Sequence, residues 1–202
     1  MRQRTFDGLE AVIIRDLSSA GLRGHCVASR LFFCLIYLPY SMSFDLWIVF
    51  LAKYFPYVVA GLFVIFALTR SQARKAQILL FCEGAAAALL SRGVVEALRL
   101  FIHRPRPFVA DPSIVPLISE TSFSFPSGHA AFFFALATTV YLRDKRLGVW
   151  FFLAALLIGI ARVLAGVHYV TDILGGAALG VVAAYGTHLF FARYQDSIKT
   201  LP

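Results

Sequence analysis

His168 and Asp172 stand four residues apart in the segment RVLAGVHYVTD, residues 162–172. On a helix this spacing places the two side chains one turn apart on the same face. The Asp172 carboxylate can then accept a hydrogen bond from one ring nitrogen of His168 and leave the other nitrogen, in a fixed tautomer, as a nucleophile. The spacing therefore predicts an activated histidine, and Gly166 allows the tight turn before it.

The segment FPSGH, residues 125–129, has the composition of a helix start that faces a ligand. Pro126 can end a loop, Ser127 can cap a helix, and Gly128 lets the backbone approach a bound group closely. The free N–H groups of a first helical turn favour an anion. His129 lies in that turn, so we expect it to donate a proton to a leaving group.

Basic side chains gather around these two segments. Those expected on the same side of the protein are Arg99, Arg104, Arg106 and Arg162. Asp172 and Glu96 are the obvious acids near them, so we expect a bound anion to balance the charge, and forked guanidinium groups suit phosphate. The constellation predicts phosphoryl transfer with arginines in the place of a metal ion. No metal-ligand cluster stands out in the sequence, and we expect neither a metal nor a cofactor.

Several other polar residues have simpler interpretations. Arg92, Glu96 and Arg99 share one helical face, so an ion-pair ladder is an alternative role for Arg99 and the preferred role for Arg92. We expect Glu83 to be paired or neutral, because a charge inside an apolar segment is costly. His25 and His188 are expected to be structural. Two interpretations of His103 stay open: it contacts a lipid headgroup, or it only marks the membrane interface.

The elements that must position these residues are long and apolar. The chain of 202 residues is 59% hydrophobic and 15% charged, and its mean hydropathy is +0.76. A soluble domain of this length could not bury so much apolar surface, which indicates a lipid environment. Windows long enough to span a bilayer, roughly 20 residues each, cover 46–68, 76–102, 147–167 and 172–191, and a shorter one covers 127–142.

These windows predict an all-α fold, a polytopic membrane helix bundle of about five transmembrane helices. The short apolar run 31–41 favours an interfacial or re-entrant helix, with a sixth span within 27–42 as the alternative. We expect one integral-membrane domain over residues 1–202, made of an N-terminal interfacial segment (1–42), the helical bundle (43–192) and a tail (193–202).

The basic residues predict the orientation and the kinds of partner. The links 69–77 and 141–148 are rich in Lys and Arg, and the positive-inside rule makes both cytoplasmic, so the loop 103–126 and the turn 165–170 face outward. The net charge of +8 is spread over helix ends and motifs. This distribution favours anionic lipid and an anionic substrate as partners and disfavours nucleic acid. Three cysteines without a CxxC motif predict neither a disulfide framework nor a metal site.

At the residues singled out above, the chain resembles the type 2 phosphatidic acid phosphatase (PAP2) family of membrane phosphatases, which share their site with vanadium haloperoxidases. The family motifs are K-x6-RP, PSGH and SR-x5-H-x3-D. They are matched in order and spacing by Arg99-x6-Arg106-Pro107, Pro126-Ser127-Gly128-His129 and Ala161-Arg162-x5-His168-x3-Asp172. The resemblance covers about residues 92–180. The chain departs from the family at Arg99, where the family has lysine, and at Ala161, where it has serine.

The resemblance implies a PAP2/haloperoxidase-like helical core and a phosphohistidine mechanism. His168 would be the nucleophile, Asp172 would orient it, and His129 would be the general acid. The phosphate-binding residues that it implies are Arg99, Arg106, Ser127, Gly128 and Arg162. It implies no metal.

A site at the membrane boundary suits a lipid whose phosphate lies at the level of the headgroups. Within the family, the segment RPRPFVA (104–110), the short loop to FPSGH and the compact length resemble the undecaprenyl-diphosphate phosphatases of the bacitracin-resistance type. That resemblance implies release of the terminal phosphate of undecaprenyl diphosphate at the outer side of the bacterial inner membrane, which recycles the carrier lipid of cell-wall synthesis. The alternatives are a phosphatidylglycerophosphate, phosphatidate or lipid A phosphatase, and a non-catalytic lipid-binding membrane protein. The oligomeric state is left open.

Overall fold

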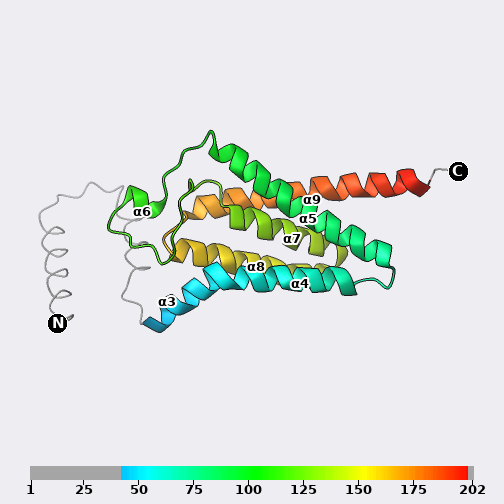
Figure 1. Cartoon of the computed structure of the whole chain (residues 1–202), viewed down its shortest axis with the longest axis horizontal. Helices are drawn as coiled ribbons and strands as arrows, with labels where there is room; N and C mark the ends of the chain where they lie inside the picture. Colours follow the sequence, from blue (N-terminus) through cyan, green and yellow to red (C-terminus); the bar gives the residue numbers. More distant parts are fainter. Residues whose placement is uncertain (1–41, 200–202) are drawn as a thin grey trace, which may run out of the picture. The chain divides into compact units, whose positions relative to one another are not determined.

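The computed structural model describes residues 42–199 of the chain, with the side chains of residues 44–193. The interfacial helix expected at 31–41, the alternative span within 27–42 and His25 lie outside the described residues. The described elements are all helical, which confirms the predicted all-α bundle (Figure 1). They are α3 (Met42–Val49), the π-helical turn η1 (Phe50–Tyr54), α4 (Phe55–Thr69), α5 (Arg74–Arg99), α6 (Pro107–Ala110), α7 (Gly128–Arg143), α8 (Lys145–Leu164) and α9 (Val170–Lys199).

Four helical stretches are long and apolar enough to cross a membrane. They are Phe44–Thr69, Arg74–Arg99, Lys145–Leu164 and Val170–Arg193, and they coincide with the four long apolar windows of the sequence. The fifth predicted helix, α7, has 16 residues and is largely buried. It contacts α5, α8 and α9, and Figure 1 shows it running between α8 and α9. Because its neighbours cover it, α7 carries mainly alanine, threonine and other compact residues toward them.

The first span is irregular where the sequence contains Pro56. Pro56 stands in the first turn of α4, and the residues just before that helix form the π-helical turn η1. A proline has no N–H to donate to the preceding turn, and its ring crowds the carbonyl there. A wider π-helical turn relieves this crowding, so α3, η1 and α4 continue as one span.

Close packing of α7 against α9 positions the segments 125–129 and 162–172 relative to each other. A Cβ atom at Gly176 would meet the Ser127 carbonyl oxygen, and one at Gly180 would meet the Ala131 carbonyl oxygen. Gly176 and Gly180, four residues apart on α9, therefore let the backbones of α7 and α9 approach closely. As a consequence, the start of α7 lies beside the first turn of α9, where the Ser127 N–H donates to the Asp172 carbonyl oxygen at 3.0 Å.

The two basic links meet at one end of the bundle. Arg70 Nη2 donates to the Arg143 carbonyl oxygen at 3.4 Å and pairs with Asp144 Oδ2 at 3.7 Å. This contact confirms that the two links share a side, as the orientation argument requires. At the other end, the segment between α5 and α7 folds over the helix ends, and the Leu117 N–H donates to the Ala165 carbonyl oxygen at 3.1 Å.

Candidate active site

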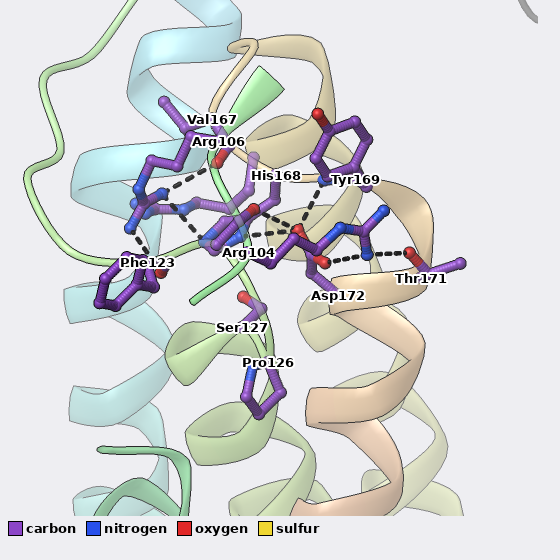
Figure 2. Close-up of polar contacts among 12 residues, drawn as sticks. Arg104, Arg106, Phe123, Pro126, Ser127, Val167, His168, Tyr169, Thr171 and Asp172 are labelled. Atoms are coloured by element: carbon purple, nitrogen blue, oxygen red, sulfur yellow. Dashed lines mark hydrogen bonds and ion pairs between the residues drawn. The ribbon is translucent and has the colours of Figure 1, made fainter. Parts of the chain in front are cut away.

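The predicted site residues come from four helices and two connections, which meet at the end of the bundle opposite the basic links. Arg99 ends α5, Ser127 caps α7, Arg162 lies in the last turn of α8, and Asp172 lies in the first turn of α9. Arg106 stands in the loop before α7, and His168 in the turn before α9 (Figure 2). The contacts below show that the structure brings these residues together.

His168 and Asp172 form the pair that their spacing predicts. His168 Nδ1 lies 3.4 Å from Asp172 Oδ2, and both side chains are buried. On the other side of the ring, Nε2 lies 3.5 Å from Arg106 Nη1. A carboxylate on one side and a cationic donor on the other favour the same tautomer, with the proton on Nδ1 and a free lone pair on Nε2. Gly166, at a φ of 74°, makes the turn that delivers the ring.

Asp172 is held by more groups than the sequence indicates. Oδ2 also accepts from the Ser124 hydroxyl and, at 2.8 Å, from the Tyr169 N–H. Oδ1 accepts from Arg104 Nη1 at 2.7 Å, and the Arg104 guanidinium lies over the Tyr169 ring, 4.1 Å from its centroid. Figure 2 shows Arg104 reaching Asp172 from the loop. Hydrogen bonds on both oxygens fix the carboxylate, so it can orient His168.

His168 is poised as a neutral base. Burial, with help from the positive charges of Arg162 and Arg106, lowers the pKa of His168 to about 4, although the hydrogen bond to Asp172 acts in the opposite direction. At neutral pH the imidazole therefore carries its lone pair and is able to act as a nucleophile. Burial also lowers the pKa of Arg106, to about 10, which leaves its guanidinium charged at neutral pH.

The start of α7 has the form that FPSGH predicts. Ser127 is the N-cap residue, and its side chain accepts from the Ala130 N–H. Gly128 begins the helix, and the space that a Cβ atom would fill there is taken by the guanidinium of Arg92. The His129 ring makes no hydrogen bond to another described residue, but the charges of Arg162, Glu120 and Arg92 act on it. His129 thus lies within the same charged cluster as the arginines.

Glu120 corrects the expected charge balance. Asp172 and Glu96 lie beside the arginines as expected, but Glu120 is a further acid that the expectation did not include. Glu120 binds Arg162 through Oε1 and lies 3.5 Å from Arg106 Nη2 through Oε2. Burial favours the neutral form of this carboxyl, but the hydrogen bond and charge of Arg162 and the charge of Arg106 outweigh it and lower the pKa of Glu120.

The cluster nevertheless keeps a positive excess. Its arginines are Arg92, Arg99, Arg104, Arg106 and Arg162, and its carboxylates are Glu96, Glu120 and Asp172. Five positive and three negative charges leave a net charge of +2 without the histidines. The buried Nε atoms of Arg99 and Arg162 also have no hydrogen-bond partner among the described residues. A phosphate dianion could neutralise the excess and accept these donors.

Polar residues in the loop before α7 belong to the site, although the sequence argument did not single them out. Ser122 accepts from Arg99 Nη1 at 3.2 Å and from Arg106 Nη2 at 3.0 Å, and Ser124 binds Asp172. With Glu120, these serines form the run SETSFS (119–124) directly before FPSGH. A polar run that leads into a ligand-binding motif was the signal that could have identified them.

The remaining polar residues behave mostly as expected. Glu83 is paired with Arg143 and lies 2.7 Å from His188 Nδ1, so it is paired as predicted, and His188 has a structural partner. His103 packs edge-on against Phe123, with ring centroids 4.7 Å apart. Within the part of the chain that the structure describes, no group of three or more His, Cys, Asp or Glu side chains is arranged to hold a metal ion.

Three curated relatives are similar to parts of this chain. The bacitracin transport permease protein BcrC of Bacillus licheniformis is 32% identical over 137 residues, 67% of this chain and 66% of that protein. Phosphatidylglycerophosphatase B of Bacillus subtilis (strain 168) is 38% identical over 117 residues, 52% of each chain. The undecaprenyl-diphosphatase BcrC of Bacillus subtilis (strain 168) is 30% identical over 100 residues, 50% of each chain. The chain thus spans between half and two thirds of the length of these relatives.

A solved structure is also similar to this chain. The crystal structure of Aquifex aeolicus LpxE superimposes with a TM-score of 0.64 at 28% sequence identity, and covers 77% of this chain and 92% of that one. The sequence model of the PAP2 superfamily matches residues 78–196, which is more than half of the chain and includes all the predicted site residues. The chain is therefore a multi-pass membrane protein that belongs to the PAP2 superfamily, as the three motifs predict.

Proposed function

We propose that this protein is a metal-independent lipid phosphatase that removes the terminal phosphate of undecaprenyl diphosphate. The observation that carries the proposal is the buried His168–Asp172 pair, whose free Nε2 faces Arg106 within a cluster of excess positive charge. Such a site holds a nucleophile, its orienting acid and an anion-binding surface within contact distance. This combination suits phosphoryl transfer by positioning and charge neutralisation.

The first step transfers the phosphoryl group to the protein. His168 Nε2 forms a bond to the terminal phosphorus while the bond from that phosphorus to the leaving oxygen breaks. The leaving oxygen keeps the electron pair and takes a proton from His129, which must enter the step as an imidazolium. Burial and the charge of Arg162 oppose that form in the protein without a bound anion, so the negative charge of the bound phosphate has to supply its stabilisation. Arg99, Arg106 and Arg162, with the N–H groups that follow Ser127 and Gly128, bind the phosphate oxygens as charge develops on them.

The second step releases inorganic phosphate. His129, now neutral, takes a proton from water as the water oxygen attacks the phosphorus of the phosphohistidine. The phosphorus–nitrogen bond breaks, and Nε2 recovers its lone pair. Asp172 keeps Nδ1 protonated through both steps, so the ring returns in the tautomer in which it began.

The place of the site favours a lipid substrate at the outer face of a bacterial inner membrane. The site lies where the spans of α5, α8 and α9 begin or end, so a lipid phosphate at the headgroup level could reach it while the tail stays in the bilayer. The basic links lie at the opposite end, and the positive-inside rule assigns them to the cytoplasm. Similarity to the undecaprenyl-diphosphatase BcrC supports the polyprenyl diphosphate as substrate.

A phosphatidylglycerophosphate phosphatase is the second candidate. The observation that favours it is the 38% identity to phosphatidylglycerophosphatase B over 117 residues, which is higher than the identity to either BcrC protein. The covered share of the chain is smaller in that comparison, 52% against 67% for the Bacillus licheniformis protein. We therefore place undecaprenyl diphosphate first.

Phosphate release by purified protein in detergent tests the proposal. Undecaprenyl diphosphate and phosphatidylglycerophosphate are supplied in parallel with excess EDTA, and His168→Ala serves as the blank. We expect a clear preference for undecaprenyl diphosphate and a loss of at least roughly 1,000-fold in the variant. Preference for phosphatidylglycerophosphate would establish the second candidate, and a strict requirement for Mg²⁺ would contradict the arginine-based mechanism. Hydrolysis of a soluble short-chain diphosphate by intact cells tests the outward orientation.

A further inference from the structure

Arg92 lies across the start of α7 and is not one of the residues that the motifs identify. It stands on α5, seven residues before Arg99. Its Nη1 atom occupies the space where a side chain at position 128 would begin. Gly128 is the first residue of α7 and directly precedes His129, the proposed proton donor. The Arg92 guanidinium therefore lies beside the leaving-group side of the proposed reaction.

The contacts of Arg92 leave half of its guanidinium available. Arg92 Nη2 pairs with Glu96 Oε1 at 2.7 Å, and the same oxygen accepts from Arg99 Nη1 at 3.1 Å, so the predicted ion-pair ladder is present. Arg92 Nη1 has no acceptor among the described residues, and the side chain is 44% exposed. A ligand at the start of α7 could therefore reach this nitrogen.

The ladder places two cationic groups next to each other along α5. Arg99 is almost fully buried, donates through Nη2 to the Pro126 carbonyl oxygen at 3.0 Å, and has a buried Nε without a partner among the described residues. Arg92 is the more exposed of the two and lies against Gly128. Glu96 pairs with both guanidinium groups and holds them near each other, so each arginine could bind one of two neighbouring anionic groups.

We propose that Arg92 binds the second phosphate of a diphosphate lipid and makes the site selective for diphosphates over monophosphates. The inference rests on the proposed phosphatase function and narrows its substrate class. When the terminal phosphate transfers to His168, the bridging oxygen leaves with the electron pair on the second phosphate and takes the His129 proton. Arg92 then neutralises the lipid monophosphate that departs. An alcohol leaving group has no charge for Arg92 to bind.

Substitution of Arg92 tests this role through a ratio of rates. Undecaprenyl diphosphate and undecaprenyl monophosphate share one tail, so the ratio of their kcat/KM values isolates the second phosphate. We expect Arg92→Gln to lower that ratio by about 10- to 100-fold, the effect of one lost hydrogen bond between charged groups. Arg92→Lys should recover part of the ratio, because it restores the charge without the fork. Lys75→Gln, which removes an equal charge at the other end of α5, should leave the ratio unchanged.

An equal loss on both lipids, or no loss on either, would overturn the inference. A binding measurement separates this outcome from failure of the proposed function. Titration of wild type and Arg92→Gln with methylenediphosphonate and with orthovanadate needs no turnover. We expect the variant to lose affinity for methylenediphosphonate about 10-fold more than for orthovanadate. An unchanged ratio of affinities would refute a second-phosphate site whichever lipid the protein hydrolyses.

Discussion

At the scale of single residues, the candidate site depends on the hydrogen bonds that the two carboxylate oxygens of Asp172 accept. One carboxylate oxygen faces His168, Ser124 and the Tyr169 N–H, and the other binds Arg104. Because both oxygens are engaged, the carboxylate cannot rotate away from the imidazole without breaking several hydrogen bonds. We infer that Arg104 and Ser124 act on the reaction through Asp172, as positioning residues.

The protonation of His168 gives a prediction about acid pH. Its pKa is lowered from 6.5 to about 4, so the ring stays neutral as the pH falls through 6.5 and gains a proton only near pH 4. We expect kcat/KM, corrected for ionisation of the substrate phosphate, to hold down to about pH 5. At pH 5.5, kcat/KM should be about tenfold higher than it would be with a nucleophilic histidine of the ordinary pKa, 6.5. Rates measured from pH 4 to pH 8 check this, with return to pH 7 as the control for unfolding. An acid limb centred near pH 6.5 would contradict the buried, neutral nucleophile.

The His168–Asp172 contact was predictable from sequence, whereas the charge balance was not. The spacing predicted the contact by way of a shared helical face, but His168 precedes α9, which begins at Val170. The two side chains meet because Asp172, in the first turn of α9, reaches back to the turn and also accepts from the Tyr169 N–H. Glu120 lies between Arg106 and Arg162 because the loop 103–127 folds back over the bundle. No periodic pattern in a Pro- and Ser-rich loop indicates where such a carboxylate comes to lie, so its partners emerged only from the tertiary structure.

At the scale of elements, the site depends on the distance between α7 and α9. Helix α7 carries Ser127 and His129, and α9 carries Asp172, so the two helices must lie close for the groups to meet. Two glycines four residues apart, such as Gly176 and Gly180, are typical of a close helix contact. The partner helix could not be predicted, because small residues indicate a close approach without identifying what approaches.

A glycine pair on α9 tests this packing. A Cβ atom at Gly180 would meet backbone atoms of α7, which cannot move aside as a side chain could, whereas nothing lies within 4 Å of one at Gly186. We expect Gly180→Ala to lower stability by about 1–3 kcal/mol and to reduce activity, because α7 must shift. Gly186→Ala, the matched control, should be neutral or stabilising by up to about 1 kcal/mol. Thermal unfolding in detergent measures the stability of both variants. Equal melting temperatures would show that the contact between α7 and α9 does not limit the stability of the protein.

At the scale of the whole molecule, the two ends of the described bundle have different chemistry. One end carries the basic links, joined by Arg70 and Asp144. The other end carries the arginine cluster with its excess of positive charge. The four long spans could be predicted from the sequence, because the bilayer sets the apolar length of a span. The Lys/Arg asymmetry predicts the orientation. The fold of the loop over the site could not be predicted from the sequence, because it depends on tertiary contacts such as the hydrogen bond between Leu117 and Ala165.

The central claim is that His168 carries the phosphoryl group during turnover, and trapping that group tests it most directly. Protein is mixed with undecaprenyl diphosphate labelled with ³²P at the terminal phosphate, quenched in alkaline detergent, and digested to locate the label. We predict a label on His168 that is stable to alkali and labile to acid, as a phosphoramidate should be, and that is absent from His168→Ala. Turnover without labelled protein, or a label on another residue, would contradict the account.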